Sequence, residues 1–383
     1  MIRKSEAEIY DLLEEYEKEA ITPADFSSMV QNNNIVVLKG RKRSVCAGKD
    51  LSIKVNCSVG ANHGGMEYRD QIEKLRAVAS HEHTPDIMMD LSTAVFKAPL
   101  YTEIIEQVGC PVGTIPYYTC FDPEKGIDPG MLMQTIEEQA ANGVSFMTLH
   151  FTADMELFQK ARRRQIPVIS RGGSILLRDM MINKRSTNIL IDHFQDIVKI
   201  CRKYSVAVSV GTVFRPSVFS DALDEANLLE LSAQGKIIDA LIDSGIRVMQ
   251  EGLGHISLDK LKPYTEIIRN RRYVPFMPLG PVVSDQTRGL DHITAAIGAA
   301  YLASLGGADI INSITREEHM GGIPSIQATL EALSASYVVR SAINESRFPN
   351  YFMSISHKSS NCMNQDGTVG CGRCGCECPF LLT

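Results

Sequence analysis

Short apolar runs alternate with longer segments of helical periodicity along most of this chain. Eight such runs, of which all but the last contain or end in a polar residue, are Ile53–Asn56, Asp86–Asp90, Val112–Pro116, Phe146–His150, Pro167–Arg171, Val206–Gly211, Arg247–Glu251 and Val274–Pro278. Such alternation predicts parallel strands joined by crossover helices. Eight strand-helix units over about 230 residues predict an α/β fold, a (β/α)8 barrel of the TIM type, whose active site lies at the C-terminal ends of the strands.

A ninth apolar run, Ala308–Asn312, leaves the strand assignment open. Either one of the first eight runs is not a strand, or an extra strand follows the barrel. We expect helices near residues 5–20, 292–305 and 325–344. The expected organisation is an N-terminal segment (1–50), a catalytic barrel (51–322), and a C-terminal helix with a cysteine-rich tail (323–383).

The composition of the 383 residues supports this picture. With 44% hydrophobic and 22% charged residues, the chain suits one large α/β domain with appendages. Its formal net charge of -6 argues against nucleic acid as a partner, and no run of about 18 apolar residues exists to span a membrane. We therefore expect a cytoplasmic protein that binds neither nucleic acid nor membranes.

Polar side chains at the strand ends would converge in such a barrel. They are Asp90, His150, Arg171, Arg215, Glu251 and His255. His255 ends a glycine-rich turn, and His319 lies in a charged loop after the ninth run. The two histidines either share one divalent metal ion or separately cap helices and face solvent. The run Ser170–Ser174 is either a phosphate cradle at a helix start or a simple glycine turn.

Four cysteines lie within eight residues near the C-terminus. Cys371, Cys374 and Cys378 have the spacing C-x2-C-x3-C, which favours a 4Fe-4S cluster whose fourth iron is open to an external ligand. A structural zinc site or a disulfide-bonded tail is the alternative, although the sequence has no second C-x-x-C pair. Cys376 is either spare or exchanges with a neighbouring ligand.

Several motifs occur in the order that is typical of the phosphomethylpyrimidine synthase family. The matching runs are Met89–Thr93, Pro111–Pro116, Ser170–Ser174, Arg215–Pro216, Asp224–Ala226, Glu251–His255, Leu279–Pro281, Asp291–Thr294 and Glu318–His319. The chain therefore resembles this family from about Lys54 to the C-terminal cysteines. The resemblance implies a radical S-adenosylmethionine lyase that converts 5-aminoimidazole ribonucleotide to 4-amino-5-hydroxymethyl-2-methylpyrimidine phosphate in thiamine biosynthesis.

The resemblance also implies cofactors, partners and site residues. It implies a 4Fe-4S cluster on Cys371, Cys374 and Cys378, S-adenosylmethionine at the open iron, and zinc or iron on His255 and His319. Glu251 matches a catalytic, substrate-binding carboxylate. The other matching substrate contacts are Met89, Tyr118, His150, Ser170, Arg171, Gly172, Gly173 and Arg215. In the family the cysteine tail reaches the partner subunit of a homodimer, and flavodoxin or ferredoxin is the expected electron donor.

Three substrate-binding positions depart from the family pattern. Ser58 stands where the family has Asn, Thr212 replaces Asp, and Met277 replaces Tyr. These changes reshape the pocket and leave the cluster and metal residues in place. The alternative activity is therefore that of 5-hydroxybenzimidazole synthase, which makes the lower-ligand base of a cobamide from the same substrate. A third hypothesis is a non-catalytic ribonucleotide-binding relative or subunit, which the retained cysteines and histidines disfavour.

Overall fold

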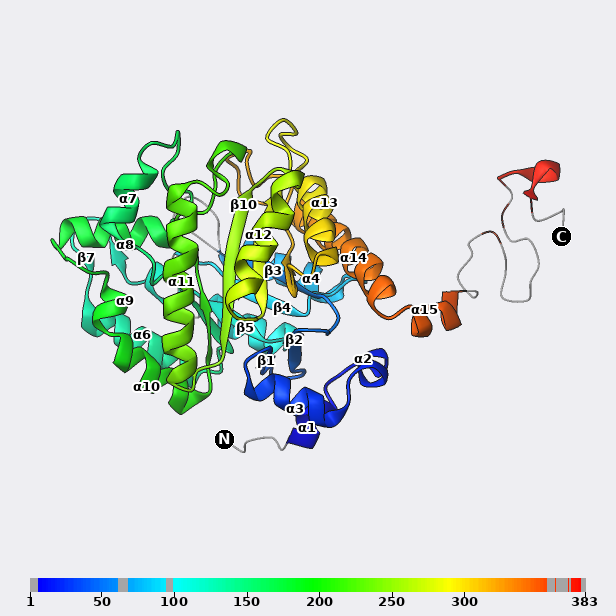
Figure 1. Ribbon diagram of the computed structural model, residues 1–383, viewed down its shortest axis with the longest axis horizontal. Helices are drawn as coiled ribbons and strands as arrows, with labels where there is room; N and C mark the ends of the chain where they lie inside the picture. The colour runs from blue at the N-terminus through cyan, green and yellow to red at the C-terminus, as the bar shows by residue number, and fades with distance from the viewer. Residues whose placement is uncertain are drawn as a thin grey trace.

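The computed structural model describes residues 6–60, 68–93, 99–356, 362, 371 and 373–379. Its main part is a barrel of eight parallel strands, and the helices that follow the strands form an outer layer (Figure 1). In their order around the barrel the strands are β11 (Phe276–Val282), β10 (Val248–His255), β9 (Ala207–Val210), β8 (Phe146–Leu149), β5 (Val112–Thr114), β4 (Ile87–Asp90), β3 (Lys54–Val59) and β12 (Ile310–Asn312). β11 and β12 meet at the seam, where Asp309 N donates to Phe276 O at 3.0 Å. The predicted (β/α)8 architecture is confirmed.

The barrel strands are apolar runs because both of their faces are covered. Every residue of β4, β8 and β9 is buried. In a barrel of this kind, inward side chains fill the interior and outward side chains pack against the helices. This double burial explains why the strands could be recognised in the sequence.

Helices connect successive strands, and several begin at a side-chain cap. Asp128, Ser170 and Asp224 each accept a hydrogen bond from a backbone N–H in the first turn of the helix that follows. The helices of this layer are α4 (Tyr68–Ser80), α5 (Leu100–Glu103), α6 (Pro129–Ala141), α7 (Met155–Ala161), α8 (Arg171–Ile182), α9 (Ile189–Asp192), α10 (Phe194–Tyr204), α11 (Glu225–Asp243), α12 (Leu258–Arg271), α13 (Asp291–Ser304) and α14 (Ile326–Arg347). The helices predicted near 292–305 and 325–344 are confirmed as α13 and α14.

Smaller elements lie within these connections. They are the π-helical turn η1 (Ile104–Val108), the 3-10 turns η2 (Pro116–Tyr118) and η3 (Phe219–Asp221), and the short antiparallel pair β6 (Phe121–Asp122) and β7 (Gly126–Ile127).

One strand prediction is wrong. The run Pro167–Arg171 pairs with no strand, and it leads as an extended segment into α8. β8 pairs directly with β9 in parallel, from Phe146 opposite Ala207 to Leu149 opposite Val210, so no strand fits between them. The ninth run supplies β12, the strand that completes the barrel.

The N-terminal segment lies below the barrel, at the end opposite to the predicted site (Figure 1). It contains α1 (Glu6–Tyr10), α2 (Glu15–Ala20), α3 (Pro23–Gln31) and the hairpin β1 (Ile35–Leu38) and β2 (Val45–Gly48), so the helix expected over 5–20 is broken in two. The Asn33 side chain exchanges two 2.9 Å hydrogen bonds with the backbone of Val248, where β10 begins. Glu17 forms a buried 3.0 Å ion pair with Lys54, where β3 begins. The C-terminal strand ends therefore remain free of this segment.

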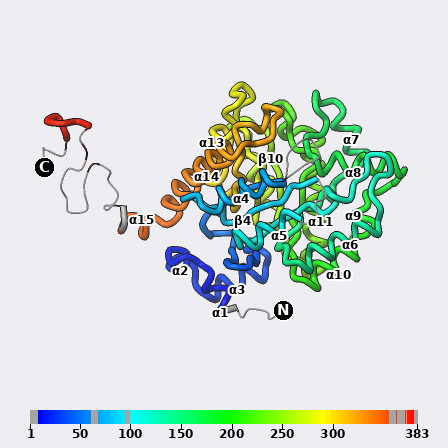
Figure 2. Tube along the Cα trace, turned by 180° about the vertical axis from the view of Figure 1, so that it is seen from behind, coloured from blue at the N-terminus to red at the C-terminus, as the bar shows by residue number. Residues whose placement is uncertain are grey.

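The C-terminal part runs past the same lower end of the barrel. Arg347 at the end of α14 donates to Leu51 O at 2.6 Å, and α15 (Pro349–Ser356) follows. The Tyr16 ring packs against the rings of Phe348, Tyr351 and Phe352, with ring centroids 5.0–5.4 Å apart. The described cysteine segment, with the turn η4 (Gly375–Glu377), lies apart from the barrel in both Figure 1 and Figure 2.

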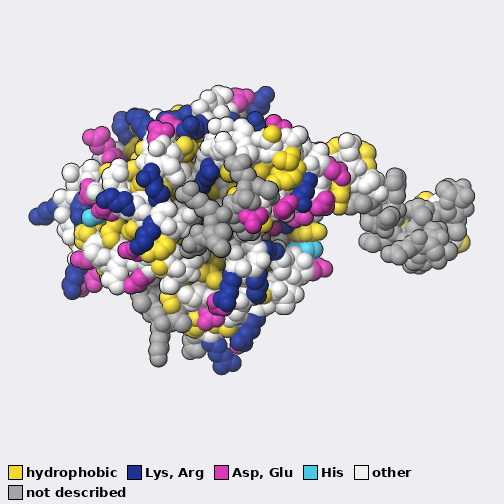
Figure 3. Space-filling view, turned by 90° about the horizontal axis from the view of Figure 1, so that it is seen from below, with side chains coloured by type: hydrophobic (Ala, Val, Ile, Leu, Met, Phe, Trp, Pro, Cys, Tyr) yellow, Lys and Arg dark blue, Asp and Glu magenta, His cyan; other side chains and the backbone are white. Residues whose placement is uncertain are grey.

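The surface seen from below carries charges of both signs. Figure 3 shows Lys and Arg side chains interspersed with Asp and Glu and with apolar patches on this face. Among the described residues, no helix combines the length and the apolar character that a membrane span requires.

Candidate active site

The C-terminal ends of the strands carry most of the predicted substrate contacts. Ser58 is opposite Met89 in the β3–β4 ladder, and Glu251 is opposite Met277 in the β10–β11 ladder. Ser58 is exposed, whereas Met89, Glu251 and Met277 are buried. The remaining contacts follow strand ends: Tyr118 ends η2, His150 follows β8, and Thr212 and Arg215 follow β9. The barrel thus collects at one end residues that are widely separated in the chain.

Two cations and a carboxylate surround Tyr118. The Arg171 guanidinium carbon lies 5.5 Å from the centre of the Tyr118 ring, a cation–π distance. The charges of Arg171, Arg215 and Glu251 all act on the Tyr118 hydroxyl. Burial raises the pKa of Tyr118 to about 12, so its hydroxyl stays protonated. This arrangement can hold an anionic group beside a neutral hydrogen-bond donor.

Glu251 is a buried carboxyl inside the barrel. Its Oε1 accepts hydrogen bonds from Thr148 Oγ1 at 2.7 Å and Ser209 Oγ at 3.0 Å. Burial raises its pKa, and these two bonds and the Arg215 charge oppose the shift. A carboxyl whose pKa is raised keeps its proton to higher pH and can exchange it with a ligand.

His150 is buried beside Tyr117. Its Nδ1 lies 2.6 Å from the Tyr117 hydroxyl oxygen. Burial, with a smaller contribution from the Arg215 charge, lowers the pKa of His150 to about 3. The imidazole is therefore neutral at physiological pH.

The segment Ser170–Gly173 forms the first turn of α8. Ser170 is the N-cap, and its hydroxyl accepts the Gly173 N–H at 3.1 Å. A Cβ on Gly172 would lie 2.7 Å from His150 Cε1, and a Cβ on Gly173 would lie 2.5 Å from Val213 Cγ1. Both glycines are therefore needed for close packing of the helix start against the site. Exposed Arg171 remains available to a ligand at this helix start.

His255 and His319 face each other above the strand ends. His255 ends β10, His319 lies in the loop after β12, and their Nε2 atoms are 3.1 Å apart. Each Nδ1 contacts a carboxylate: His255 meets Asp285 at 2.8 Å, and His319 meets Asp291 at 2.9 Å. Two imidazoles bound to one tetrahedral ion at the usual 2.0–2.1 Å would have nitrogens about 3.3 Å apart.

The pair therefore has the spacing and the carboxylate support that are typical of metal-binding histidines. The residues present fit a divalent ion as a two-nitrogen site. Within the described ranges, no group of three or more His, Cys, Asp or Glu side chains is placed to hold a metal ion. Such a site would leave its other coordination positions to water or substrate.

Sequence reasoning missed the residues that support these groups. Buried Glu230 of α11 accepts Thr152 Oγ1 and Thr212 Oγ1 at 2.7 Å and the backbone N–H groups of Val213 and Phe214 at 2.6 and 2.8 Å. It thereby ties the loop after β8 to the loop that carries Arg215. The available signal was a row of polar residues on one face of that helix, including Asn227, Glu230 and Gln234, which are all buried. Tyr117 was missed although it adjoins the predicted contact Tyr118, and Asp285 was missed because it lies in none of the matching runs.

The thiols of the tail are the donors that an iron-sulfur cluster requires. None of Cys371, Cys374, Cys376 and Cys378 is in a disulfide, and Cys374 and Cys376 are exposed. The Cys362 thiol is hydrogen-bonded to Cys371. In a cubane cluster each thiolate binds a different iron, so the sulfur atoms need not converge on one point. This donor set fits the cluster.

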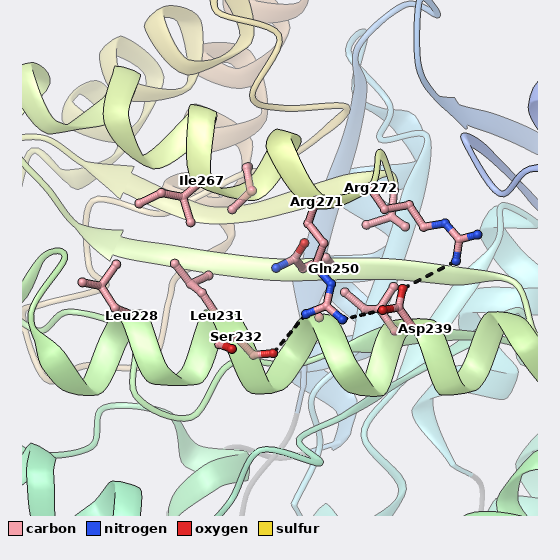
Figure 4. Close-up of a pocket in the computed structure, with 12 residues that line it drawn as sticks. Leu228, Leu231, Ser232, Asp239, Gln250, Ile267, Arg271 and Arg272 are labelled. Atoms are coloured by element: carbon pink, nitrogen blue, oxygen red, sulfur yellow. Dashed lines mark hydrogen bonds and ion pairs between the residues drawn. The ribbon is translucent and has the colours of Figure 1, made fainter.

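A separate cavity of about 220 Å³ lies between α11 and α12, outside β10 (Figure 4). Arg271 crosses it, donating to Ser232 O at 3.3 Å and to Asp239. Its apolar lining includes Leu231 and Ile267. No predicted site residue lines this cavity, so it is a gap in helix packing outside the candidate site.

Comparison with known proteins finds phosphomethylpyrimidine synthases that are similar to most of this chain. It is 33% identical over 82% of its length to the phosphomethylpyrimidine synthase of Carboxydothermus hydrogenoformans, of which 76% is covered. It is 30% identical over 96% of its length to that of Ignicoccus hospitalis, of which 92% is covered. The match to a solved structure of Yersinia pestis DHPS covers 81% of this chain and 100% of that one, at 11% sequence identity and a TM-score of 0.44. Residues 5–362 match the radical SAM ThiC family, and the chain therefore belongs to that family.

Proposed function

We propose that this protein is a radical S-adenosylmethionine lyase that converts 5-aminoimidazole ribonucleotide to 4-amino-5-hydroxymethyl-2-methylpyrimidine phosphate. The observation that carries this proposal is the set of charges around Tyr118, in which Arg171, Arg215 and buried Glu251 act on one hydroxyl at the barrel mouth. The names of the matching relatives, which are phosphomethylpyrimidine synthases, support the same activity.

The residues at the mouth suit the parts of a ribonucleotide. Arg171, at the start of α8, and Arg215 provide positive charge for the phosphate. Tyr118 and His150 offer hydrogen-bonding groups that stay neutral, since burial keeps the first protonated and the second uncharged. Glu251 can accept a hydrogen bond from the heterocycle or exchange a proton with it. Ser58, Met89, Ser170, Gly172 and Gly173 would complete the walls of the substrate site.

His255 and His319 would hold one divalent ion, zinc or iron, next to this site. Asp285 and Asp291 would fix the orientation of the two rings by accepting their Nδ1–H groups, which leaves both Nε2 lone pairs for the ion. The bound ion would polarise a substrate oxygen.

Cys371, Cys374 and Cys378 would hold the 4Fe-4S cluster, with S-adenosylmethionine at the remaining iron. When bound, this group supplies the one-electron reductive cleavage of S-adenosylmethionine that starts the rearrangement. The described cysteines lie apart from the barrel mouth of their own chain (Figures 1 and 2). We therefore also propose a homodimer in which the tail reaches the partner's site. Flavodoxin or ferredoxin would provide the electron.

A second candidate activity is formation of 5-hydroxybenzimidazole from the same ribonucleotide. The residues at two positions that depart from the family pattern, Thr212 and Met277, support this second activity. The Thr212 hydroxyl donates to Glu230 at 2.7 Å and so is engaged within the protein, and Met277 is a buried apolar group beside Glu251. Two polar substrate contacts of the family pattern are thus absent, and each unmade contact costs about 1–3 kcal/mol.

An anaerobic reaction tests these proposals. Protein with a reconstituted cluster is mixed with S-adenosylmethionine, dithionite and 5-aminoimidazole ribonucleotide, and the products are identified by mass spectrometry. Deoxyadenosine with the hydroxymethylpyrimidine phosphate supports the first activity, and deoxyadenosine with 5-hydroxybenzimidazole supports the second. Deoxyadenosine with neither product would refute both. A complete absence of deoxyadenosine would favour the non-catalytic relative.

A further inference from the structure

One edge of the His150 ring is enclosed by three groups. A Cβ built on Gly172 would lie 2.7 Å from His150 Cε1 and 2.9 Å from Nδ1. A Cβ built on Gly211 would lie 2.7 Å from Nδ1 and 2.8 Å from Cε1. The Tyr117 hydroxyl meets the same Nδ1 at 2.6 Å. The Nδ1–Cε1 edge is thus covered, and the Nε2 edge is the one left for a ligand.

The direction of the Tyr117–His150 hydrogen bond follows from the proton that the phenol keeps. The Tyr117 hydroxyl contacts His150 Nδ1 at 2.6 Å, and one of these two atoms donates to the other. Burial raises the pKa of Tyr117 well above its ordinary value, so the phenol keeps its proton. Among the described residues, His150 Nδ1 is the acceptor available to that proton.

The opposite direction would leave a proton without a partner. If Nδ1 carried the hydrogen and donated it to the phenol, the buried hydroxyl proton would have no acceptor in the described part of the chain. An unsatisfied buried donor costs about 1–3 kcal/mol. Tyr117 therefore donates to Nδ1, and a neutral imidazole that accepts at Nδ1 carries its own proton on Nε2.

Burial keeps the ring neutral, and a neighbouring positive charge adds to this effect. Arg215, from the loop after β9, is the charged group that acts on His150, and its positive charge disfavours an imidazolium ion. Glu251 and Tyr118 act on Tyr117 and not directly on the ring. A ring that is neutral, enclosed at one edge and protonated at the other can donate a hydrogen bond but cannot accept a proton at Nε2.

We propose that Tyr117 is a positioning residue that fixes His150 as the Nε2–H tautomer, so that His150 donates a hydrogen bond to an acceptor oxygen of the ribonucleotide. This inference rests on the proposed substrate class and adds to it a direction of hydrogen bonding. It makes His150 a recognition group and not a general base.

The tautomer is tested by NMR on the full chain. Protein labelled with 15N-histidine is observed at neutral pH without substrate, and the His150 signals are assigned by their absence in His150→Gln. We expect a protonated Nε2 and an unprotonated Nδ1. In Tyr117→Phe the donor to Nδ1 is lost, and we expect a population with the proton on Nδ1. A protonated Nδ1 in the unmodified protein would overturn the inference.

Binding of 5-aminoimidazole ribonucleotide, measured by calorimetry, tests the consequence. We expect Tyr117→Phe to weaken binding about tenfold, the loss that corresponds to one hydrogen bond of about 1.4 kcal/mol. The matched control is Tyr101→Phe, which removes another buried hydroxyl, one that accepts from Asn142 Nδ2 at 3.0 Å, and should leave affinity unchanged. Equal binding by Tyr117→Phe and the unmodified protein would overturn the positioning role. Failure of the unmodified protein to bind, with Nε2 protonated as expected, would instead overturn the proposed function.

Discussion

Replacing Glu230 tests what holds the loop that carries Arg215. The Glu230 carboxylate receives four hydrogen bonds: Oε1 from Thr152 Oγ1 and Val213 N, and Oε2 from Thr212 Oγ1 and Phe214 N. The side chain is fully buried, and burial raises its pKa. Two of its four donors are backbone N–H groups, which cannot turn away if the acceptor is lost.

The size of the effect follows from these contacts. In Glu230→Gln one oxygen becomes an NH2 group, and in either orientation it opposes one backbone N–H. The threonine hydroxyls can rotate and accept from it. One buried N–H therefore loses its acceptor, at a cost of about 1–3 kcal/mol. Glu230→Ala removes both acceptors and leaves a cavity, so we expect about 3–6 kcal/mol.

These free energies convert to measurable shifts. An unfolding entropy of about 2.1 cal/mol/K per residue over 383 residues corresponds to about 1.2 °C in Tm for each kcal/mol. We expect a lower Tm by about 1–4 °C for Glu230→Gln and about 4–7 °C for Glu230→Ala. The chain has no Trp, so unfolding is followed by far-ultraviolet circular dichroism.

Hydrogen exchange locates the change. The amides of Val213 and Phe214 should exchange faster in Glu230→Gln, while peptides from the N-terminal segment keep their protection. The matched control is Glu225→Gln on the same helix, where Glu225 is half-exposed and pairs with Lys160; its Tm should change by less than about 1 °C. Unchanged exchange in residues 212–214, together with an unchanged Tm in Glu230→Gln, would refute the reasoning.

Three further predictions concern the metal, the cluster and Glu251. Replacing His255 or His319 with Ala should lower zinc or iron affinity at least about tenfold, since each supplies half of the protein nitrogens; full metal content in either variant would contradict a shared site. Cys371→Ala should lose the cluster, measured as iron content and visible absorbance, whereas Cys376→Ala should retain it; loss in the second variant would show that the ligand assignment is wrong. Burial raises the pKa of Glu251, so the folded state binds this proton more tightly than the unfolded state, and stability declines as pH rises from the unfolded pKa of about 4.3 to the folded pKa. Glu251→Gln has no such ionisable group, so it avoids the cost of ionising a buried carboxyl. Its free energy of unfolding in urea, minus that of the unmodified protein, should therefore be greater at pH 8 than at pH 4. The same difference at both pH values would contradict the raised pKa.

Local sequence patterns were enough to recognise the barrel. Strands covered on both faces are largely apolar runs, as in β4, β8 and β9, whose residues are all buried. The spacing of the tail cysteines and the order of the motifs likewise lie in the chain itself and require no coordinates. The pattern failed at Pro167–Arg171, because whether an apolar run becomes a strand depends on a free neighbouring strand, and β8 and β9 are already paired with each other.

The geometry of the candidate site depended on tertiary packing. His255 and His319 are 64 residues apart in sequence, yet their Nε2 atoms are 3.1 Å apart, and no local pattern specifies that distance. Glu230 resembles a solvated helix residue until α11 packs its polar row against the loops after β8 and β9. Burial then converts ordinary side chains into groups with shifted pKa values, since desolvation is a property of the whole fold. Sequence could therefore nominate candidate residues at the strand ends, and only packing could decide their distances, their protonation and the groups that support them.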